Sequence, residues 1–370
     1  MHAFLADELE LALDPSASVG QARTWVTRLS GGLATWARRL EFEPFRLRVV
    51  GTAGSGKTQL ALRILEDAAV NGQRAEYVCF NRPLADHLAQ IAPAAVKVTT
   101  FHMLGDQQMR AAGHPPDFRQ PGVFEQLADA YIRKSPAPEE MLDVLVVDEG
   151  QDFAQGWANA LLAYLKPDGK AWWLEDPLQN LYDKPRIELP GWVTLRADVN
   201  YRTPREILRQ IGLFVDVGES VQAASPLQGG EIDIATYADF AGLKDATVAA
   251  IGKARSAGFK ASDIAVLTYC GRERSALMPF DQLGAYRLRR CDGTYDDAGN
   301  PVFQDGDILV ETVFRFKGQS APCIILTEID FDALDERVAR RLYVGATRAR
   351  MQLAMVMSDR AATKLMERLA

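Results

Sequence analysis

The chain has 370 residues, a length that suits two core domains better than one. Its hydrophobic fraction of 48% is that of an ordinary globular protein, and its net charge of −7 excludes a global basic field that would attract nucleic acid. The four cysteines lie far apart without a C-x-x-C pair, which favours reduced thiols in a cytoplasmic protein over zinc ligands. The N-terminus lacks the order of a signal peptide, and no apolar run approaches a membrane span.

Residues 1–45 are expected to form an N-terminal helical segment, broken at Asp14-Pro15 and Gly31-Gly32. Its large apolar residues recur at helical spacing. They are Trp25, Leu29, Leu33, Trp36 and Leu40. This spacing predicts a stripe that faces the core.

The functional interpretation depends on the run GTAGSGKT over residues 51–58, which follows a strand-like run, Leu47–Val50, and opens a helical pattern. This is G-x-x-x-x-G-K-[ST] in the strand-to-helix context of a phosphate-binding loop, whose glycines turn successive N–H groups toward an anion. The candidate ligands are Gly51, Gly54, Gly56 and Lys57 for the phosphates and Thr58 for Mg²⁺. The alternative is a glycine-rich turn with a chance lysine.

Downstream, short apolar strands alternate with helical patterns, which predicts a parallel sheet with helices on both faces. The expected strands are Ala75–Phe80, Val96–Thr99 and Val144–Glu149, with helices over Leu84–Ile91 and Val123–Lys134 and otherwise irregular chain over residues 105–143. The last strand ends in two acids. In an NTPase site Asp148 would hold Mg²⁺ and Glu149 would activate the attacking water; the alternative is two solvated acids at a strand end.

Five segments carry a further pattern along the chain. They are Asp148–Asp152, Trp173–Tyr182, Leu195–Pro204, Thr312–Ser320 and Leu342–Arg350. In the same order they resemble the D-E-x-Q-D, G-D-P-x-Q-x-I-Y, L-x-x-N-Y-R-S, T-x-H-x-x-K-G-x-E and Y-V-A-x-T-R-A boxes of the UvrD/Rep group of superfamily 1 helicases. The resemblance covers about residues 46–357.

The resemblance implies an α/β fold with two RecA-like P-loop NTPase domains, each a mostly parallel sheet with helices on both faces. The first domain is expected over residues 46–190 and the second over residues 191–370. Second-domain strands are expected at Glu231–Thr236, Ile264–Thr268, Asp307–Thr312, Cys323–Thr327 and Gln352–Val356, with helices at Arg205–Val215, Ala241–Ser256 and Asp330–Tyr343. The polar stretch Cys291–Asp305 carries turn signals but no assigned function.

For ATP and Mg²⁺, the resemblance implies roles for residues outside the phosphate loop. Gln179 would sense the γ-phosphate, and Arg202 and Arg348 would be arginine fingers. Tyr201 would stack on the base, and Gly318 would lie at the nucleotide. An arginine from a second domain stabilises transition-state charge only when the cleft closes, so hydrolysis would be coupled to domain motion.

The resemblance also implies contacts with single-stranded DNA, RNA not being excluded. The candidates are Phe80, Asn81, Arg82, Thr100, Phe101, His102, Tyr182 and Thr312. Tyr182 would stack on a base, as exposed aromatics in single-strand channels do. Core packing is the alternative for Phe80, Phe101 and Tyr182, and a structural histidine is the alternative for His102.

The chain departs from the family at four points. Ser320 replaces the acid that binds ribose, Phe314 replaces the histidine of the same box, and Gln21 is a poor candidate for the adenine-reading glutamine. Residues 105–143 are too few for the first accessory subdomain, and residues 216–306 are expected only to complete the second core. Without these subdomains the chain is expected to unwind duplex poorly.

Three functions remain open. The leading hypothesis is an ATP-dependent single-stranded DNA translocase or helicase, with 3′-to-5′ polarity by analogy alone. The second is an ATP-driven clamp or switch that acts with a nuclease or another repair or defence partner. The third is a P-loop kinase or GTPase-like switch, which the second half of the chain, with Arg202, Lys317 and Arg348, argues against. No membrane partner is expected.

Overall fold

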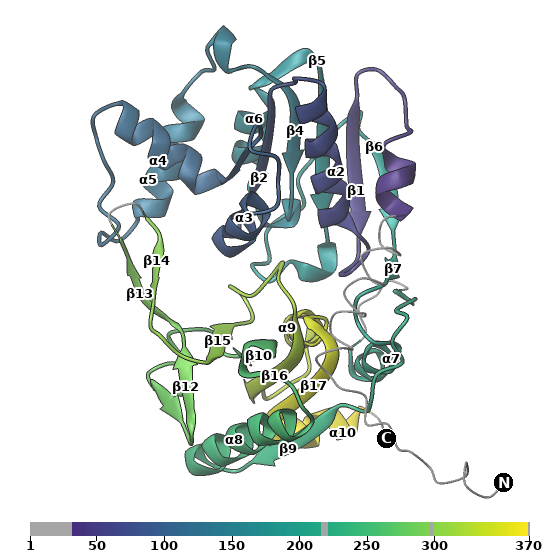
Figure 1. The fold of residues 1–370 in the computed structure, drawn as a ribbon, viewed down its shortest axis with the longest axis vertical. Helices are drawn as coiled ribbons and strands as arrows, with labels where there is room; N and C mark the ends of the chain where they lie inside the picture. Colours follow the sequence, from purple (N-terminus) through teal and green to yellow (C-terminus); the bar gives the residue numbers. More distant parts are fainter. Residues whose placement is uncertain (1–31, 216–220, 297–298, 369–370) are drawn as a thin grey trace, which may run out of the picture.

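The structure is a computed structural model that describes residues 32–215, 221–296 and 299–368. Two α/β domains face each other, each built on its own sheet (Figure 1). The predicted break at Asp14-Pro15 and residues Gln21, Trp25 and Leu29 lie outside the described residues. In the described part of the chain, no helix combines the length and apolarity needed to cross a bilayer.

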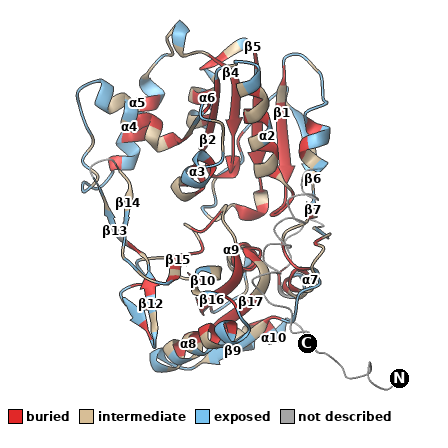
Figure 2. Ribbon diagram, in the orientation of Figure 1, coloured by how far each residue is buried: buried red, intermediate tan, exposed pale blue. Residues whose placement is uncertain are grey.

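The first sheet has the order β3-β2-β4-β5-β1-β6, and every pair in it is parallel. Its strands are β1 (Arg46–Gly51), β2 (Ala75–Cys79), β3 (Lys97–Thr100), β4 (Leu142–Val147), β5 (Leu165–Glu175) and β6 (Val193–Ala197). Its helices are α2 (Lys57–Val70), α3 (Arg82–Ala89), α4 (Phe101–Ala111), α5 (Val123–Arg133) and α6 (Gln155–Leu162). Figure 2 shows the central strands buried beneath these helices.

Alternation along β4 explains how this sheet is covered on both faces. Val144 and Val146 pack with α2 and α3, whereas Leu145 and Val147 pack with α4, α5 and α6. Successive side chains of a strand point to opposite faces, so a strand that is apolar at every position must be covered twice. The continuous apolar run in the sequence therefore predicted this arrangement correctly.

The second sheet has the order β11-β12-β15-β10-β16-β17-β9, parallel except for the β11–β12 pair. Its strands are β9 (Asp233–Tyr237), β10 (Ile264–Thr268), β11 (Gln282–Leu283), β12 (Tyr286–Arg289), β15 (Ile308–Thr312), β16 (Ala321–Ile329) and β17 (Ala349–Ser358). Its helices are α7 (Arg205–Phe214), α8 (Phe240–Ser256), α9 (Glu336–Ala346) and α10 (Asp359–Glu367). Helix α8 covers one face, and α7, α9 and α10 cover the other.

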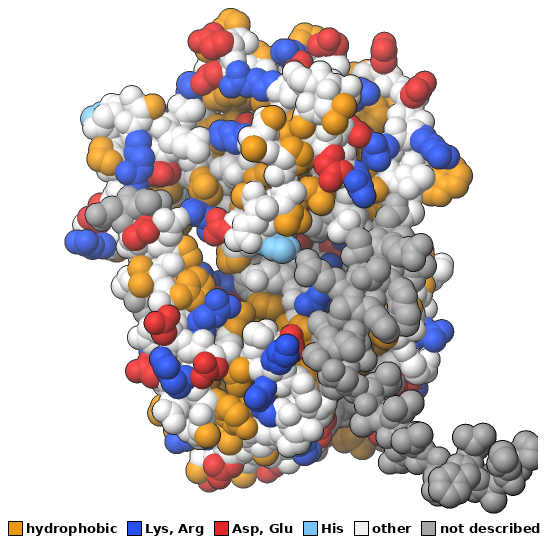
Figure 3. Space-filling view, in the orientation of Figure 1, with side chains coloured by type: hydrophobic (Ala, Val, Ile, Leu, Met, Phe, Trp, Pro, Cys, Tyr) orange, Lys and Arg blue, Asp and Glu red, His pale blue; other side chains and the backbone are white. Residues whose placement is uncertain are grey.

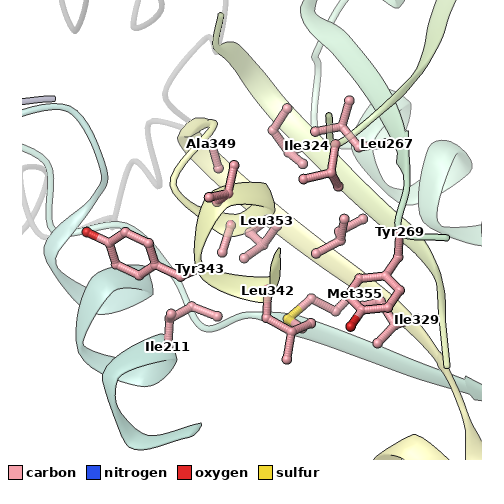
Figure 4. Close-up of a cluster of buried hydrophobic side chains, with 14 of the residues drawn as sticks. Ile211, Leu267, Tyr269, Ile324, Ile329, Leu342, Tyr343, Ala349, Leu353 and Met355 are labelled. Carbon is pink, nitrogen blue, oxygen red and sulfur yellow. The ribbon is translucent and has the colours of Figure 1, made fainter. Parts of the chain in front are cut away.

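Helix α9 is fixed to the second sheet by a cluster of apolar side chains (Figure 4). Leu342 packs there with Leu353 and Met355 of β17. The ring of Tyr343 lies at the edge of the cluster, and its hydroxyl points away from the other labelled side chains. The cluster therefore holds α9 in place, and the Tyr343 hydroxyl lies 2.9 Å from Thr52 Oγ1 of the first domain.

Several predicted boundaries were wrong. Residues 105–111 belong to α4, whose first turn is capped by Thr100 Oγ1, which accepts a hydrogen bond from the Met103 N–H. β6 pairs with β1, so the first sheet extends past the predicted boundary at residue 190. Helix α9 begins only at Glu336, because Asp335 is its N-cap.

Two segments differ from expectation in their packing. In the N-terminal segment, Leu33 packs against the first core as predicted, whereas Trp36 is 69% exposed and Leu40 is also exposed. Ala34 and Ala37 are buried instead, so only part of the predicted stripe faces the core. The stretch expected to be a loop contains a hairpin of β13 (Cys291–Tyr295) and β14 (Pro301–Phe303) that leaves the second sheet. Residues 216–306 therefore do more than complete the second core.

Candidate nucleotide and nucleic-acid sites

The phosphate loop lies between the carboxyl end of β1 and the first turn of α2. Gly54 and Gly56 have φ angles of 71° and 100°, in the left-handed region that glycine tolerates. A Cβ atom on Gly54 would lie 2.6 Å from the Cβ of Arg202, so this approach requires glycine. Helix α2 begins with no side-chain cap and no acid in its first turn, which suits its N-terminal N–H groups to an anion.

Lys57 is buried at the start of α2, and its ammonium folds back over the loop. Its Nζ donates to the carbonyl oxygens of Gly51 at 2.5 Å and Thr52 at 2.9 Å, and lies 3.7 Å from Asp176 Oδ2. Thr58 follows in the same turn and is half-buried. The cation and the hydroxyl of the motif therefore share the first turn of α2.

Asp148 and Glu149 lie directly beyond β4, beside the phosphate loop. Asp148 accepts hydrogen bonds from the Tyr77 hydroxyl and from the Glu149 N–H, both at 2.8 Å. Burial, together with the charge of Glu149, raises the pKa of Asp148. Burial acts in the same direction on Glu149, but the cations of Lys317, Lys57 and Arg348 outweigh it and lower the pKa of Glu149. Glu149 is thus held ionised.

Arg348 reaches this site from the second domain. Its guanidinium is 1% exposed and donates to Gln179 Oε1 at 3.0 Å and to the Val344 carbonyl at 3.0 Å. Gln179 Nε2 in turn donates to Asp176 Oδ2 at 2.5 Å, beside Lys57. The predicted sensor and the predicted finger are therefore directly hydrogen-bonded across the two domains.

Arg202 and Tyr201 adjoin the phosphate loop from the segment after β6. The Tyr201 N–H donates to the Gly54 carbonyl at 3.2 Å. Burial and the nearby guanidinium of Arg348 lower the pKa of Arg202 to about 9. Two cations held this close favour an anion between them.

Gly318 lies elsewhere. It adopts a φ of 79°, and a Cβ there would meet the Leu84 side chain of α3 at 3.0 Å. Nothing in this packing supports the predicted nucleotide contact of Gly318.

Lys317 is a functional candidate to which the sequence assigned no role of its own. It is 1% exposed, and its Nζ lies 2.6 Å from Asp152 Oδ2 and 3.6 Å from Glu149 Oε2. Burial raises the pKa of Asp152 to about 6, against the opposing effect of Lys317. The signal was present in the sequence, because both residues lie in the boxes that resemble the helicase family.

A cavity of about 490 Å³ lies between the domains on the other side of this pair. Six predicted nucleic-acid residues line it: Phe80, Asn81, Arg82, Thr100, His102 and Tyr182. The sequence missed other lining residues, among them Phe118, Phe124, Trp157, Lys184, Tyr295 and Phe314. These come from loops, helices and the hairpin, where an isolated aromatic residue carries no motif.

Aromatic rings and one cation form the floor of the cavity. The ring of Phe80 lies 5.5 Å from Tyr182 and 6.1 Å from Trp157, centroid to centroid. Lys184 Nζ lies 4.9 Å from the Phe80 ring and 4.5 Å from the Trp157 ring. Stacked rings with cations are the surface that single-stranded nucleic acid uses.

The packing argues against two of the predicted nucleic-acid contacts and bears on two others. Phe101 is fully buried among Phe153, Trp157 and Tyr131, and Thr312 is buried with its hydroxyl accepting from the Arg315 N–H. Asn81 lines the cavity, but its amide donates to the carbonyls of Arg315 and Lys317, both at 3.0 Å. His102 lines the cavity too, and burial with the Lys184 charge lowers its pKa to about 4.

The residues present fit ATP with Mg²⁺. The hydroxyl of Ser55 is buried in the phosphate loop without a hydrogen-bond partner among the described residues, and burial raises the pKa of Asp148. Magnesium in such sites binds one or two protein oxygens plus phosphates, which a threonine hydroxyl and a carboxylate supply. Thr58 and Asp148 would hold it.

The face shown in Figure 3 carries basic and acidic side chains interspersed. The charged groups of the nucleotide site, by contrast, are buried. A phosphate loop with paired acids on one sheet and a buried arginine from a second sheet defines a two-domain P-loop NTPase.

Residues 40–184 match the family model described as an AAA domain, and residues 307–356 match the one described as the UvrD-like helicase C-terminal domain. Together the two matches support the resemblance to the UvrD/Rep-like superfamily 1 helicases. No curated protein matches the chain. The family implies ATP hydrolysis coupled to work on nucleic acid.

Proposed function

We propose that the protein is an ATP-driven translocase on single-stranded DNA that couples hydrolysis to closure of its two domains. The observation that carries this proposal is the hydrogen bond between Arg348 and Gln179. It joins a residue of the second domain to one that also contacts Asp176 beside Lys57, so the catalytic set is complete only when the domains meet.

The residues divide the work as follows. The loop N–H groups and Lys57 bind the phosphates, and Glu149, held ionised, takes the proton of the attacking water. Mg²⁺ would neutralise phosphate charge from Thr58 and Asp148. Arg348 and Arg202 would stabilise the charge that develops on the γ-phosphate, and Tyr201 would lie against the base.

Coupling to DNA runs through Lys317. Its ammonium contacts Glu149 on the nucleotide side and Asp152, which lines the cavity, on the other. A strand on the aromatic floor would therefore favour the closed arrangement in which Lys317 and Arg348 reach the first domain. Both contacts are buried, which strengthens them relative to exposed pairs.

The test is steady-state ATP hydrolysis with no nucleic acid, with single-stranded DNA, with single-stranded RNA and with blunt duplex. We expect strong stimulation by single-stranded DNA and little by duplex. Stimulation that requires a further protein would favour the clamp hypothesis, for which the short α4–α5 region and the lack of large insertions are the supporting observations. Phosphorylation of a small molecule instead of hydrolysis would contradict both.

A further inference from the structure

The β13–β14 hairpin of the second domain reaches across to the α4–α5 region of the first (Figure 1). The Tyr295 ring lies 6.1 Å from Phe118 and 6.0 Å from Phe124. The Arg82 guanidinium donates a hydrogen bond to Asn300 Oδ1. A Cβ on Gly299 would lie 2.7 Å from the Phe118 ring, so the hairpin approaches this ring as closely as glycine allows.

These contacts close the cavity on the side away from the nucleotide site. Tyr295, Gly299 and Pro301 line it together with Phe118 and Phe124. The opposite wall is the bridge between domains at Lys317 and Asp152, which also lines the cavity. The space is therefore bounded by contacts between the domains on two sides.

We propose that this hairpin is a clasp that encloses a single strand of nucleic acid between the two domains. The proposal rests on the proposed function, since it names the ligand of the same cavity. The lining supplies what a single strand needs, namely rings for the bases and cations for the backbone, from Arg82, Lys184 and Arg315. A volume of about 490 Å³ holds a nucleotide or two and excludes duplex.

The hairpin can separate from the first domain without either domain unfolding. Within the described residues, it meets the first domain through side chains and one glycine, and neither strand of the hairpin pairs with the first sheet. Rigid elements flank it on both sides, since β12 belongs to the second sheet and α4–α5 pack on the first. Opening would therefore be a local movement of the hairpin.

Enclosure has a topological consequence that separates it from ordinary groove binding. A linear strand leaves an enclosed passage by sliding off its end, whereas a circular strand leaves only when the clasp opens. The experiment compares dissociation from a small circle of single-stranded DNA and from the linear oligonucleotide of the same sequence, after addition of excess competitor. We expect release from the circle to be slower by on the order of ten-fold.

The double substitution Tyr295→Ala with Asn300→Ala removes the ring contacts and the hydrogen bond to Arg82. It should speed release from the circle to the linear rate. Tyr295→Phe keeps the ring and should retain the slow release. Phe303→Ala is the matched control, because Phe303 lies on the same hairpin, is 42% exposed and does not line the cavity. Melting curves confirm that each variant folds.

The outcomes separate the two proposals. Wild-type protein that binds single-stranded DNA but leaves circle and line at equal rates overturns the clasp and leaves the proposed function standing. If Phe303→Ala released the circle as fast as the linear strand, that result would likewise contradict the clasp, since the Phe303 side chain is outside the passage. Wild-type protein that neither binds single-stranded DNA nor hydrolyses ATP faster with it overturns the proposed function itself.

Discussion

The nucleotide site and the aromatic cavity lie on either side of the Lys317–Asp152 pair, yet they are built in different ways. The nucleotide site is made from short stretches at the ends of strands, and its charged groups are buried and hydrogen-bonded to neighbouring polar groups. The cavity is made from single rings on α6, α5, the hairpin and loops. A site built from continuous stretches of backbone can be predicted from the spacing of its residues. A site built from side chains that are scattered along the chain becomes visible only in the folded structure.

The largest effect is expected at the catalytic acid of the nucleotide site. Glu149→Gln keeps the shape and the hydrogen bond to Gln151 but removes the charge that takes the proton, so nucleotide should bind and persist with turnover lost. Lys57→Ala should instead lose turnover together with phosphate affinity. Nucleotide affinity by fluorescence titration and single-turnover hydrolysis distinguish the two. Equal loss of nucleotide binding in Glu149→Gln would assign that residue a structural role.

Arg348→Ala should lower DNA-stimulated turnover by roughly 10³–10⁵ while nucleotide affinity stays close to wild type, because an arginine finger acts on transition-state charge. Arg348→Lys should rescue little, since a point charge does not reproduce the planar fork. Arg209→Ala is the matched control, because Arg209 is exposed and pairs with Glu206 of its own helix, α7. Turnover at saturating single-stranded DNA is the measurement. If single-stranded DNA stimulated Arg348→Ala as strongly as the wild type, the second domain would have no part in catalysis through Arg348.

The next effect concerns the pair that separates the two regions. Lys317→Met leaves the buried carboxyl of Asp152 without its cation, a change that costs about 3–5 kcal/mol in comparable buried pairs. Adding Asp152→Asn removes the uncompensated charge and should recover most of the stability. Urea unfolding of the single and double variants measures this. Full stability in Lys317→Met would mean that the pair does not form in solution.

The same contrast explains what the sequence could and could not predict. Apolar runs ending in Asp148-Glu149 or preceding the phosphate loop predicted the parallel sheets, because burial on both faces demands such runs. Helix α4 was missed because Gly105 and the polar residues after it mask the period, although the Thr100 cap was visible. The largely exposed β6 lies beyond the boundary predicted at residue 190, since only its pairing with β1 places it in the first sheet.

In the cavity, sequence reasoning could not distinguish rings that pack from rings that face a ligand. Phe80 and Phe101 had equal standing as candidates, and the structure separates them, because Phe101 faces the first core and Phe80 faces the cavity. Trp157 and Tyr295 had no signal at all, since their role arises from packing against other elements. The clasp likewise followed from contacts between segments far apart in the chain.

His102 tests whether the cavity is as desolvated as the nucleotide site. Its pKa is about 4 when folded, against about 6.5 in an unfolded chain, so the unfolded state binds a proton first as pH falls. The free energy of unfolding should therefore decline from pH 6.5 toward pH 4, by at most about 3 kcal/mol from this group. In His102→Gln, the free energy of unfolding should fall less with decreasing pH than in the wild type. His87 is an exposed histidine on α3, so His87→Gln should show the wild-type decrease. Urea unfolding at pH 7 and pH 5 measures it, and identical profiles for all three proteins would show that His102 is solvated.

The smallest expected effect belongs to Tyr182, which decides whether the rings of the cavity bind bases or merely pack. Tyr182 is 41% exposed, and its ring lies 5.5 Å from Phe80 and 5.9 Å from Phe314, centroid to centroid. Tyr182→Ala should weaken single-stranded DNA binding by about 1–3 kcal/mol, roughly 5- to 150-fold. Because the substitution removes stacking and no cation, binding should still weaken with added salt at the wild-type slope. Phe240→Ala on α8, with a ring 45% exposed and outside the cavity, should change neither quantity. Anisotropy titrations at several salt concentrations, with a melting curve for each variant, give both values. Unchanged affinity with a lower melting temperature would show that Tyr182 is a core residue. The rings of the cavity would then pack against one another without binding bases.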